Sequence, residues 1–515
     1  MRVEKLALDK TGSFSRIFLD YLTSEPQLAH THSFEPSVQG FEKALSYRKL
    51  SANNRDTLVN VLREQYNGLT ISESVETNIN SLKDQNTFTV TTGHQLNIFT
   101  GPLFFIYKIV STINICRELA NNFPEYNFVP VYWMATEDHD FAEINHVYVD
   151  GKKFSWETEQ TGAVGRFSTT ELAAIINDIP GKVGVFKKAY AESDNLADAV
   201  RNYVNELFGA TGLVVVDADH PALKAQFKSI IKDDLTIHSA FEKVTERSEY
   251  LIEKGYKPQL NPREINLFYL DDNLRSRIEK EGEKYRIVDT DLLFTKDEIL
   301  NLLDAHPEKF SPNVILRPVY QEMILPNLGY VGGPAELAYW LQYKEMFDFF
   351  RIDFPVLMPR NFGLYLDTNA QRKQQKLGLA NEEIFAGTDA LKKKYVHAMN
   401  GNLHLENERA QVEKMYVSIK KLAHKIDLTL EPHIQAQFTK HLQCLDRIQT
   451  KLEKAEKRNR EDEMNMINDL KEYAFPGGTL QERKVNLLSI TETQFIKQLL
   501  ELINPFDLRM HIFLA

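Results

Sequence analysis

Two short apolar segments joined by a helical one constrain the fold of this chain more than any other feature. Residues 87–92 (TFTVTT) alternate and are rich in β-branched side chains, which is typical of a strand. A helix is expected from Pro102, since apolar residues then recur at spacings of three and four over 103–113. Residues 128–136 (FVPVYWMAT) form a second apolar run that favours a buried strand. Strand, helix and strand in this order predict a parallel pair with a right-handed crossover.

Further apolar runs extend this unit into a larger sheet. Residues 212–220 (GLVVVDADH) and 354–360 (FPVLMPR) have the length of buried strands and are separated by helical segments. We therefore expect an α/β protein with an open parallel sheet of the doubly wound kind. Residues 150–210 and 255–310 are mixed and polar, and we expect them to form inserted subdomains.

The last third of the chain has a different periodicity. A coiled-coil seam with spacings of three and four is formed by Val412, Met415, Ile419, Leu422 and Ile426. After Pro432, a second apolar pattern runs from Ile434 to Ala455 and continues into a charged helix face. Because such seams must be covered, we expect the two helices to pair with each other or with a second subunit, and we infer a homodimer through this arm.

Composition excludes several classes of protein. The net charge of −11 argues against a nucleic-acid or anionic-membrane binder, which needs a basic surface. No apolar stretch approaches the roughly 18 residues of a membrane span, and the start of the chain has no signal-peptide pattern. Cys116 and Cys444 both fall in helical patterns, and we expect buried, inert thiols in a reducing, cytoplasmic setting.

Two polar loops follow the first two predicted strands. The first loop carries Thr92, Gly93, His94, Gln95 and Asn97, and the second carries Glu137, Asp138, His139, Asp140 and Asn145. In an open parallel sheet, ligands bind beyond the carboxyl ends of the strands, so both loops are expected at the ligand edge. The N–H groups of the helix that begins near Pro102 are expected to face the same crevice and to suit an anion.

The cluster from Glu137 to Asp140 allows several kinds of chemistry. A carboxylate can hold a substrate amine, and a His–Asp pair can remove its proton. A solvated loop is the simplest alternative. A metal site with His94 or His146 is another, and it would make a metal-dependent hydrolase that uses the Glu137–Asp140 cluster. A third alternative is a non-catalytic, ligand-binding scaffold. Phosphate-loop and dinucleotide motifs are absent from the sequence.

A third distinctive stretch covers residues 311–342. Its prolines and glycines predict several tight connections rather than a long helix, with a new helix at GGPAELAYWLQ. Arg317, beside Gln321 and Glu322, is expected either to bind an anionic ligand or to form an ion pair inside the protein.

Five ordered blocks resemble the bacterial family of cysteine-adding enzymes of bacillithiol biosynthesis (the BshC family). They lie at residues 92–108, 131–147, 311–340, 356–360 and 475–483, and the resemblance runs from about residue 85 to 490. It implies a Rossmann-like core related to class I synthetases and nucleotidyltransferases, small inserted subdomains and a C-terminal coiled coil that joins two subunits. The implied reaction joins cysteine to the amine of glucosaminyl-malate, the last step of bacillithiol synthesis.

The resemblance and the chemistry together select candidate site residues. Catalytic candidates are His94, Asp138, His139 and Asp140. Substrate-binding candidates are Thr92, Gly93, Gln95, Asn97, Glu137, Asn145, Arg317, Tyr320 and Arg360. Because an amide forms uphill in water, ATP or another nucleotide is the expected activator, and no metal is expected to be essential. The chain departs from the family's Thr-Gly-Gln-Gln pattern by placing His94 in the first motif.

The expected domain order follows from these segments. We expect the first part of the core at 1–150, its continuation with inserted subdomains at 151–310, and its end at 311–390. The coiled-coil arm is expected at 391–472, and the chain returns to the core at 473–515.

Overall fold

The computed structural model describes residues 1–181, 183–400, 405–490, 492 and 494–515. The chain divides into two compact units. The first comprises residues 1–364 and 480–513, and the second comprises residues 365–479 and 514–515. Residues 401–404 of the predicted arm lie outside the described residues.

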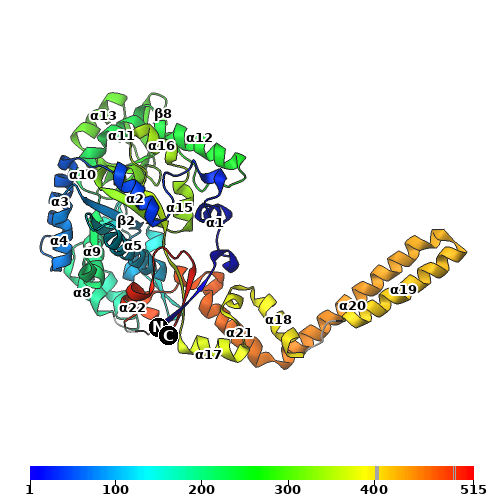
Figure 1. The fold of residues 1–515 in the computed structure, drawn as a ribbon. Coiled ribbons are helices and arrows are strands. Elements are labelled where there is room, and N and C mark those ends of the chain that lie inside the picture. The colour runs from blue at the N-terminus through cyan, green and yellow to red at the C-terminus, as the bar shows by residue number, and fades with distance from the viewer. Residues whose placement is uncertain (182, 401–404, 491, 493) are drawn as a thin grey trace. The chain divides into compact units, whose positions relative to one another are not determined.

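The centre of the first unit is a five-stranded parallel sheet (Figure 1). Its spatial order is β13-β12-β2-β3-β6, and the strands are β2 (Thr87–His94), β3 (Asn127–Met134), β6 (Val214–Asp217), β12 (Asn327–Gly332) and β13 (Val356–Pro359). This arrangement confirms the predicted open parallel sheet. Chain order reverses between β2 and β12, and this switch point is where doubly wound folds bind ligands.

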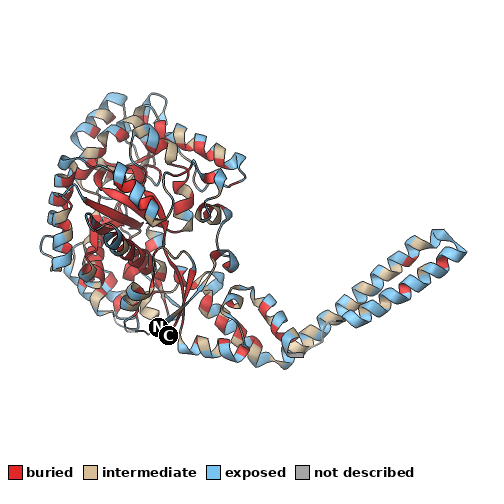
Figure 2. Cartoon of the chain, in the orientation of Figure 1, coloured by how far each residue is buried: buried red, intermediate tan, exposed pale blue. Residues whose placement is uncertain are grey.

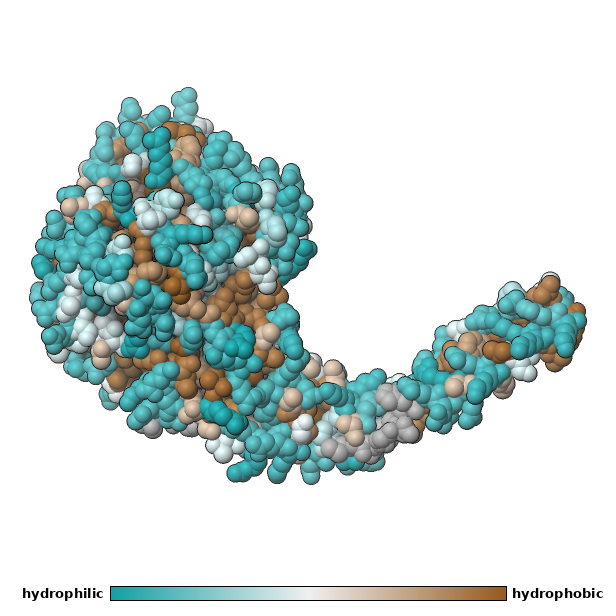
Figure 3. Space-filling view, in the orientation of Figure 1, coloured by the Kyte–Doolittle hydropathy of each residue, from teal (hydrophilic) through white to brown (hydrophobic). Residues whose placement is uncertain are grey.

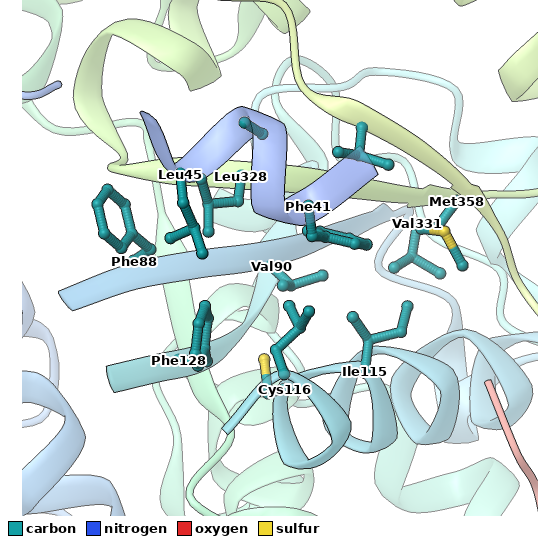
Figure 4. Close-up of a cluster of buried hydrophobic side chains, with 13 residues drawn as sticks. Phe41, Leu45, Phe88, Val90, Ile115, Cys116, Phe128, Leu328, Val331 and Met358 are labelled. Carbon is teal, nitrogen blue, oxygen red and sulfur yellow. The ribbon is translucent and has the colours of Figure 1, made fainter. Parts of the chain in front are cut away.

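Helices cover both faces of this sheet, because alternate strand residues point to opposite faces. On one face, the ring of Tyr330 stacks on Trp340 of α15 (Pro334–Trp340), with centroids 4.7 Å apart. On the other face, Val331 joins an apolar cluster with side chains of α2 (Val38–Tyr47) and α5 (Leu103–Asn122) (Figure 4). The strands are buried throughout most of their length (Figure 2).

Strand β12 is the main correction to the sequence analysis. Residues 311–342 were expected to form only tight connections before a helix, but 327–332 form a central strand. Asn327, Gly329 and Gly332 interrupt the apolar run that would have signalled it. Gly329 is required by packing, since a Cβ there would lie 2.6 Å from the ring of Phe41.

The two stretches that were expected to be insertions differ: residues 255–310 contain most of a second sheet, whereas residues 150–210 contain one strand of a hairpin and are otherwise mainly helical. An antiparallel sheet of order β10-β9-β8-β7-β11 lies between β6 and β12 in the chain, with β7 (Leu267–Asp271), β8 (Leu274–Glu281), β9 (Lys284–Ile287), β10 (Leu293–Phe294) and β11 (Phe310–Pro312). A hairpin of β4 (His146–Val149) and β5 (Lys152–Ser155) follows β3.

The remaining elements of the first unit surround these sheets. A three-stranded sheet has the order β1-β15-β14, with β1 (Arg2–Leu6), β14 (Phe362–Leu366) and β15 (Met510–Leu514). The other α-helices are α1 (Arg16–Leu22), α3 (Ala52–Gln65), α4 (Glu73–Ser81), α6 (Phe141–Ile144), α7 (Leu172–Ile176), α8 (Gly184–Glu192), α9 (Leu196–Phe208), α10 (Pro221–Lys224), α11 (Lys228–Thr236), α12 (Ser239–Glu253), α13 (Lys296–Ala305), α14 (Arg317–Ile324), α16 (Lys344–Phe350) and α22 (Phe495–Leu502).

The second unit is helical and contains the predicted arm. Its helices are α17 (Thr368–Leu377), α18 (Thr388–Asn400), α19 (Glu406–Ile426), α20 (Glu431–Asn459) and α21 (Glu461–Ala474). Helices α19 and α20 form a hairpin that packs through Tyr416, Ala423 and Ile434 (Figure 1). The predicted seam residues Met415, Ile419, Leu422 and Ile426 are exposed instead, and apolar surface gathers towards the tip of the hairpin (Figure 3).

The two cysteines differ in their surroundings. Cys116 is buried as expected, but Cys444 on α20 is exposed, so the expectation of two buried thiols is wrong for that residue. The hairpin is too thin to bury both faces of α20. Among the described residues, no helix is long and apolar enough to cross a membrane.

Candidate functional site

A cavity of about 370 Å³ lies at the switch point of the central sheet. It is bounded by residues at the carboxyl ends of β2, β3, β12 and β13, including Gly93, Thr136, Gly333 and Arg360. Five of the predicted site residues besides Gly93 and Arg360 also line it, namely His94, Gln95, Glu137, Asp138 and Arg317. The sequence therefore placed these residues correctly at the edge of the sheet that carries the cavity.

An ion pair that the sequence analysis missed joins the two sides of the switch point. The Nζ of Lys108, a buried residue of α5, lies 2.6 Å from Oε2 of Glu336 and donates a hydrogen bond to the carbonyl of Gly93 at 2.8 Å. Glu336 also accepts from the hydroxyl of Tyr330 and from the N–H of Gly333. Burial raises the pKa of Glu336, but the Lys108 ammonium and these donors together lower it below its ordinary value. The pair is therefore ionised and holds the ends of β2 and β12 together.

Arg317 is the best-placed residue for an anionic ligand. Its guanidinium lies 5.9 Å from the ring of Trp133 and 5.5 Å from the ring of Tyr330. Nη1 donates to Oε1 of Gln321 at 2.9 Å, whereas buried Nη2 has no hydrogen-bond partner in the described part of the chain. A buried donor without a partner is costly, so this nitrogen points to a ligand that supplies an acceptor.

A buried polar network positions Arg317 through its hydrogen bond to Gln321. Gln321 and Asn327 donate to the same oxygen of Glu322, at 2.9 Å and 2.7 Å. Thr91 of β2 donates to Asn327, so the network is tied to the sheet. Burial raises the pKa of Glu322 to about 7, although the nearby Arg48 guanidinium opposes the shift.

Asp138 is held by three donors. Gln95 donates to one carboxylate oxygen, and Arg275 of β8 and the N–H of His139 donate to the other, at 3.2 Å and 2.7 Å. Burial raises the pKa of Asp138, but the His139 side chain, whose Nδ1 lies 3.3 Å from the carboxylate, and these donors together outweigh burial and hold the pKa well below its ordinary value. Asp138 is therefore ionised and fixes Arg275 at the cavity wall.

Two further predicted residues, Glu137 and Arg360, form ion pairs inside the protein. Glu137 pairs with Lys224, which also lies 3.1 Å from Asp219. Arg360 forms a two-pronged ion pair with Glu482, at 2.5 Å and 3.0 Å, and both side chains are buried. Arg360 lines the cavity, but its charge is already balanced by a carboxylate.

His94 lines the cavity in a neutral form. Its ring stacks on Phe105 with centroids 5.2 Å apart. Burial lowers the pKa of His94 well below its ordinary value, and the nearby cations Lys108 and Arg360 lower it further. Its Nε2 is buried without a hydrogen-bond partner among the described residues. An uncharged imidazole here can exchange a hydrogen bond with a ligand, but it is a weak base.

Six predicted site residues do not line the cavity. Thr92 donates to the carbonyl of Val331, Asn97 to that of Glu143, and Tyr320 to that of Ala218. Asp140 caps α6 by accepting from the N–H of Glu143, and Asn145 contacts His146. His139 lies beside Arg275. Their contacts support the loops around the cavity.

The start of α5 also differs from expectation. The N–H of Leu103 donates to the carbonyl of Val485 at 2.8 Å, and the Asn486 side chain donates to the carbonyls of Phe99 and Gly101. The expected anion site at this helix start is therefore wrong for that N–H, because the segment 485–486 occupies it. An isolated helix pattern cannot reveal a covering segment so distant in the chain.

Glu143 is a cavity residue that the sequence analysis missed. Its carboxylate has no ion-pair partner among the described residues. Partial burial raises its pKa above the ordinary value, and repulsion from Asp140 and Asp138 raises it further. A carboxylate with a raised pKa that faces a ligand cavity is suited to accept a proton.

The metal-site alternative finds no support in the geometry. Glu137, His139 and Asp140 contact different groups, namely Lys224, Arg275 and the N–H of Glu143, and the His94 ring stacks on Phe105. Over the described ranges, no three His, Cys, Asp or Glu side chains converge to hold a metal ion.

The fold and the cavity define a Rossmann-like protein that has a cavity at the switch point of its sheet and carries a coiled-coil hairpin. Comparison with known proteins agrees with both parts. Residues 1–361 match the model described as the N-terminal Rossmann-like domain of bacillithiol biosynthesis BshC. Residues 363–515 match the C-terminal coiled-coil domain of the same family. The chain belongs to the BshC family.

Curated relatives extend over the whole chain. A protein of Flavobacterium psychrophilum named "Putative cysteine ligase BshC" is 42% identical, covering 99% of this chain and 98% of its own length. A protein of the same name from Flavobacterium johnsoniae is 40% identical, covering 99% of this chain and 99% of its own length. Another from Cytophaga hutchinsonii is 39% identical, covering 99% of this chain and 98% of its own length. A solved structure described as an arginyl-tRNA synthetase of Campylobacter jejuni aligns with a TM-score of 0.21, which is too low to support an argument.

Proposed function

We propose that this chain is a cysteine ligase that joins the carboxyl group of cysteine to the amine of glucosaminyl-malate, the last step of bacillithiol synthesis. The family and the names of its relatives support the reaction class. The substrate assignment depends chiefly on one observation, the buried guanidinium of Arg317, which lines the cavity and has an Nη2 without a hydrogen-bond partner among the described residues. Planar guanidinium groups bind carboxylates in a bidentate manner, and the malate group carries two carboxylates.

Glu143 is the residue that we propose as the proton acceptor. The amine of the acceptor must lose a proton before it can attack an acyl carbon, and a carboxylate with a raised pKa serves this step. Asp138 already accepts from Gln95, Arg275 and His139, so its proposed part is to hold Arg275 and the loop in place. His94 remains a candidate for a hydrogen bond to the substrate.

Activation of the cysteine carboxyl is a separate part of the proposal. Condensation of a carboxylate with an ammonium group releases water and is uphill, so we propose ATP or another nucleotide as the source of free energy. Arg317 and Arg483 line the cavity, and the structure gives neither an ion pair with a carboxylate among the described residues. These two cations are available to the malate carboxylates and to the phosphates of a nucleotide. When bound, the nucleotide would activate the carboxyl group of cysteine.

Mass spectrometry of thiol products tests the reaction. The full chain is incubated with glucosaminyl-malate and cysteine, with and without ATP. We expect a product whose mass equals the sum of both substrates minus water, and only in the presence of ATP. Binding of glucosaminyl-malate without any product in either mixture would overturn the proposal that this chain alone is the ligase.

We also propose that the hairpin of α19 and α20 joins two copies of the chain. Leu422 is 61% exposed and Ile426 is 72% exposed, although both belong to a coiled-coil repeat. Light scattering should give twice the 59.5 kDa chain mass. Leu422→Glu with Ile426→Glu should give the single mass, whereas the matched exposed change Lys421→Glu should not. A monomeric parent protein would contradict this proposal.

A further inference from the structure

A second cavity lies at the opposite, amino edge of the central sheet. Its volume is about 820 Å³, and it is bounded by Asn327 at the start of β12 and Phe354 just before β13. The end of α2 and the end of α16 form its other walls. None of its lining residues belongs to the cavity at the switch point.

The charges around this cavity do not cancel. Four basic side chains line it, Lys43, Arg48, Lys344 and Arg351, against two carboxylates, Asp348 and Asp353. Lys344 pairs with Asp348, and Arg48 lies 3.5 Å from the buried carboxylate of Glu322 and 3.8 Å from Asp353. Within the described chain, Lys43 and Arg351 have no carboxylate partner. Two positive charges therefore remain for a ligand.

Arg48 gives the cavity a fixed donor. The residue is only 7% exposed, and its Nη2 donates to the backbone carbonyls of Glu322 and Leu325. Its Nε is buried and has no hydrogen-bond partner among the residues that the structure describes. A guanidinium anchored in this way keeps its charge and orientation before any ligand arrives.

An aromatic wall accompanies these cations. Tyr47 is 66% exposed, and its ring centroid lies 6.4 Å from that of Phe34. Lys43 and Tyr47 are four residues apart on α2 and therefore lie on the same side of the helix. The other side of α2 carries Phe41 and Leu45, which pack onto the sheet (Figure 4). Packing of α2 thus leaves a cation and a ring together at the cavity.

We propose that this second cavity binds a small phosphate monoester that carries an aromatic or other planar group. Lys43 and Arg351 would bind the dianionic phosphate, since guanidinium and ammonium groups form their strongest hydrogen bonds with such oxyanions. Tyr47 and Phe34 would contact the planar group, whose burial adds to the affinity. The proposal does not rest on the ligase reaction, because it concerns binding at a separate place.

Calorimetric titration of the full chain with phenyl phosphate tests this site. We expect saturable binding at one site per chain, and at least about tenfold weaker binding after Lys43→Gln with Arg351→Asn. Asparagine is chosen at position 351 because Arg351 has a φ of +55°, which asparagine tolerates. Lys49→Gln, an exposed change next to Arg48 but outside the cavity, is the matched control and should bind as the parent does.

Two further measurements separate this site from the other cavity and test the aromatic wall. Arg286→Gln, an exposed change that lies outside both cavities, should leave phenyl phosphate binding unchanged. Tyr47→Ala should weaken phenyl phosphate binding without weakening binding of inorganic phosphate. The proposal is overturned if phenyl phosphate shows no saturable binding, or if Arg317→Gln abolishes binding while the Lys43 and Arg351 changes do not. Equal affinities for phenyl phosphate and inorganic phosphate would overturn the part assigned to Tyr47 and Phe34. Thermal melting of each variant identifies any loss of folding.

Discussion

The two edges of the central sheet carry similar cations in different states of pairing. At the carboxyl edge, Lys108 is paired with Glu336, Arg360 with Glu482 and Arg275 with Asp138. At the amino edge, Lys43 and Arg351 face a larger cavity, and the described residues offer them no carboxylate. The difference teaches that the number of basic residues near a cavity does not measure its affinity for anions. Pairing inside the protein decides how many of them remain for a ligand.

The internal pairs also explain how the carboxyl edge keeps its shape. Each joins loops that are far apart in the chain, and each is at least partly buried, so breaking one leaves an uncompensated charge. Arg317 and Arg483 are exceptions, since the described residues give neither an ion pair; Arg317 is held by a neutral amide, and its Nη2 has no hydrogen-bond partner among them. The following predictions test this comparison, from the largest expected effect to the smallest.

Breaking a paired cation should affect stability most. Glu482→Gln leaves Arg360 buried without its carboxylate, and we expect the free energy of unfolding to fall by about 3–5 kcal/mol. Thermal and chemical denaturation measure this loss. Glu281→Gln, which breaks the exposed pair with Arg286, is the control and should cost less than about 1 kcal/mol. Similar losses in both variants would refute the distinction between buried and exposed pairs.

Removing the cation with the free donor should affect catalysis. Arg317→Gln should lower kcat/KM for glucosaminyl-malate by about 300-fold, since truncating a buried charge that binds a carboxylate costs about 2–5 kcal/mol. An acceptor without the malate group should lose much less. Arg286→Gln is the control. Equal losses with both acceptors would show that Arg317 does not bind the malate carboxylates.

Glu322 should make stability depend on pH. Its pKa is raised from 4.5 to about 7 in the folded chain, so the folded state holds this proton more tightly than the unfolded state. Its contribution is therefore fully present below pH 4.5 and is lost as pH rises through 7, by up to about 3 kcal/mol. Glu322→Gln mimics the protonated acid and should remove this loss.

The measurement is the difference in melting temperature between Glu322→Gln and the parent from pH 5 to pH 8. We expect the variant to gain relative to the parent as pH rises. Asp234, whose pKa burial also raises to about 7, is present in both proteins, so its contribution cancels in the difference. A difference that stays constant with pH would mean that Glu322 does not titrate in this range.

Loss of the proposed proton acceptor should give the smallest effect of the four. Glu143→Gln should lower kcat by about 100-fold, the lower end for general base catalysis, because the carboxylate is partly exposed. The parent's rate should fall at acidic pH as Glu143 is protonated, and this limb should begin above pH 4.5 because its pKa is raised. The variant should lack that limb, and the exposed change Glu192→Gln should retain it. An unchanged pH profile in Glu143→Gln would assign the proton to another group.

Sequence patterns predicted the parts of the fold that depend on local periodicity. Strands β2, β3, β6 and β13 and helices α5, α19 and α20 all fall within or next to the expected stretches. Strand β12 was missed because its glycines serve close packing, which an apolar pattern does not record. Asp140 was expected to be catalytic, but Asp140 and Glu143 have the spacing of a helix cap, and a local signal for the capping role was therefore present.

The site was only partly predictable, because its charges pair across the fold. A lysine within the apolar stretch FFIYKIV indicated that Lys108 is buried and needs a partner, but no local pattern identified Glu336 as that partner. Arg360 and Glu482 belong to two of the recognised blocks, yet their pairing removes Arg360 from the free cations. The arm showed the same limitation, since a heptad pattern marks an apolar seam without saying which helix covers it.

By itself, the sequence determined the parallel sheet, the edge of the sheet that carries the cavity, the helical arm and the family. These features follow from side-chain periodicity and from ordered motifs, which act over a few turns or strands. Only the tertiary structure decided which of the charged residues are free to act. Electrostatic pairing depends on distances of a few ångströms between side chains from distant segments, and only the folded chain brings those segments together.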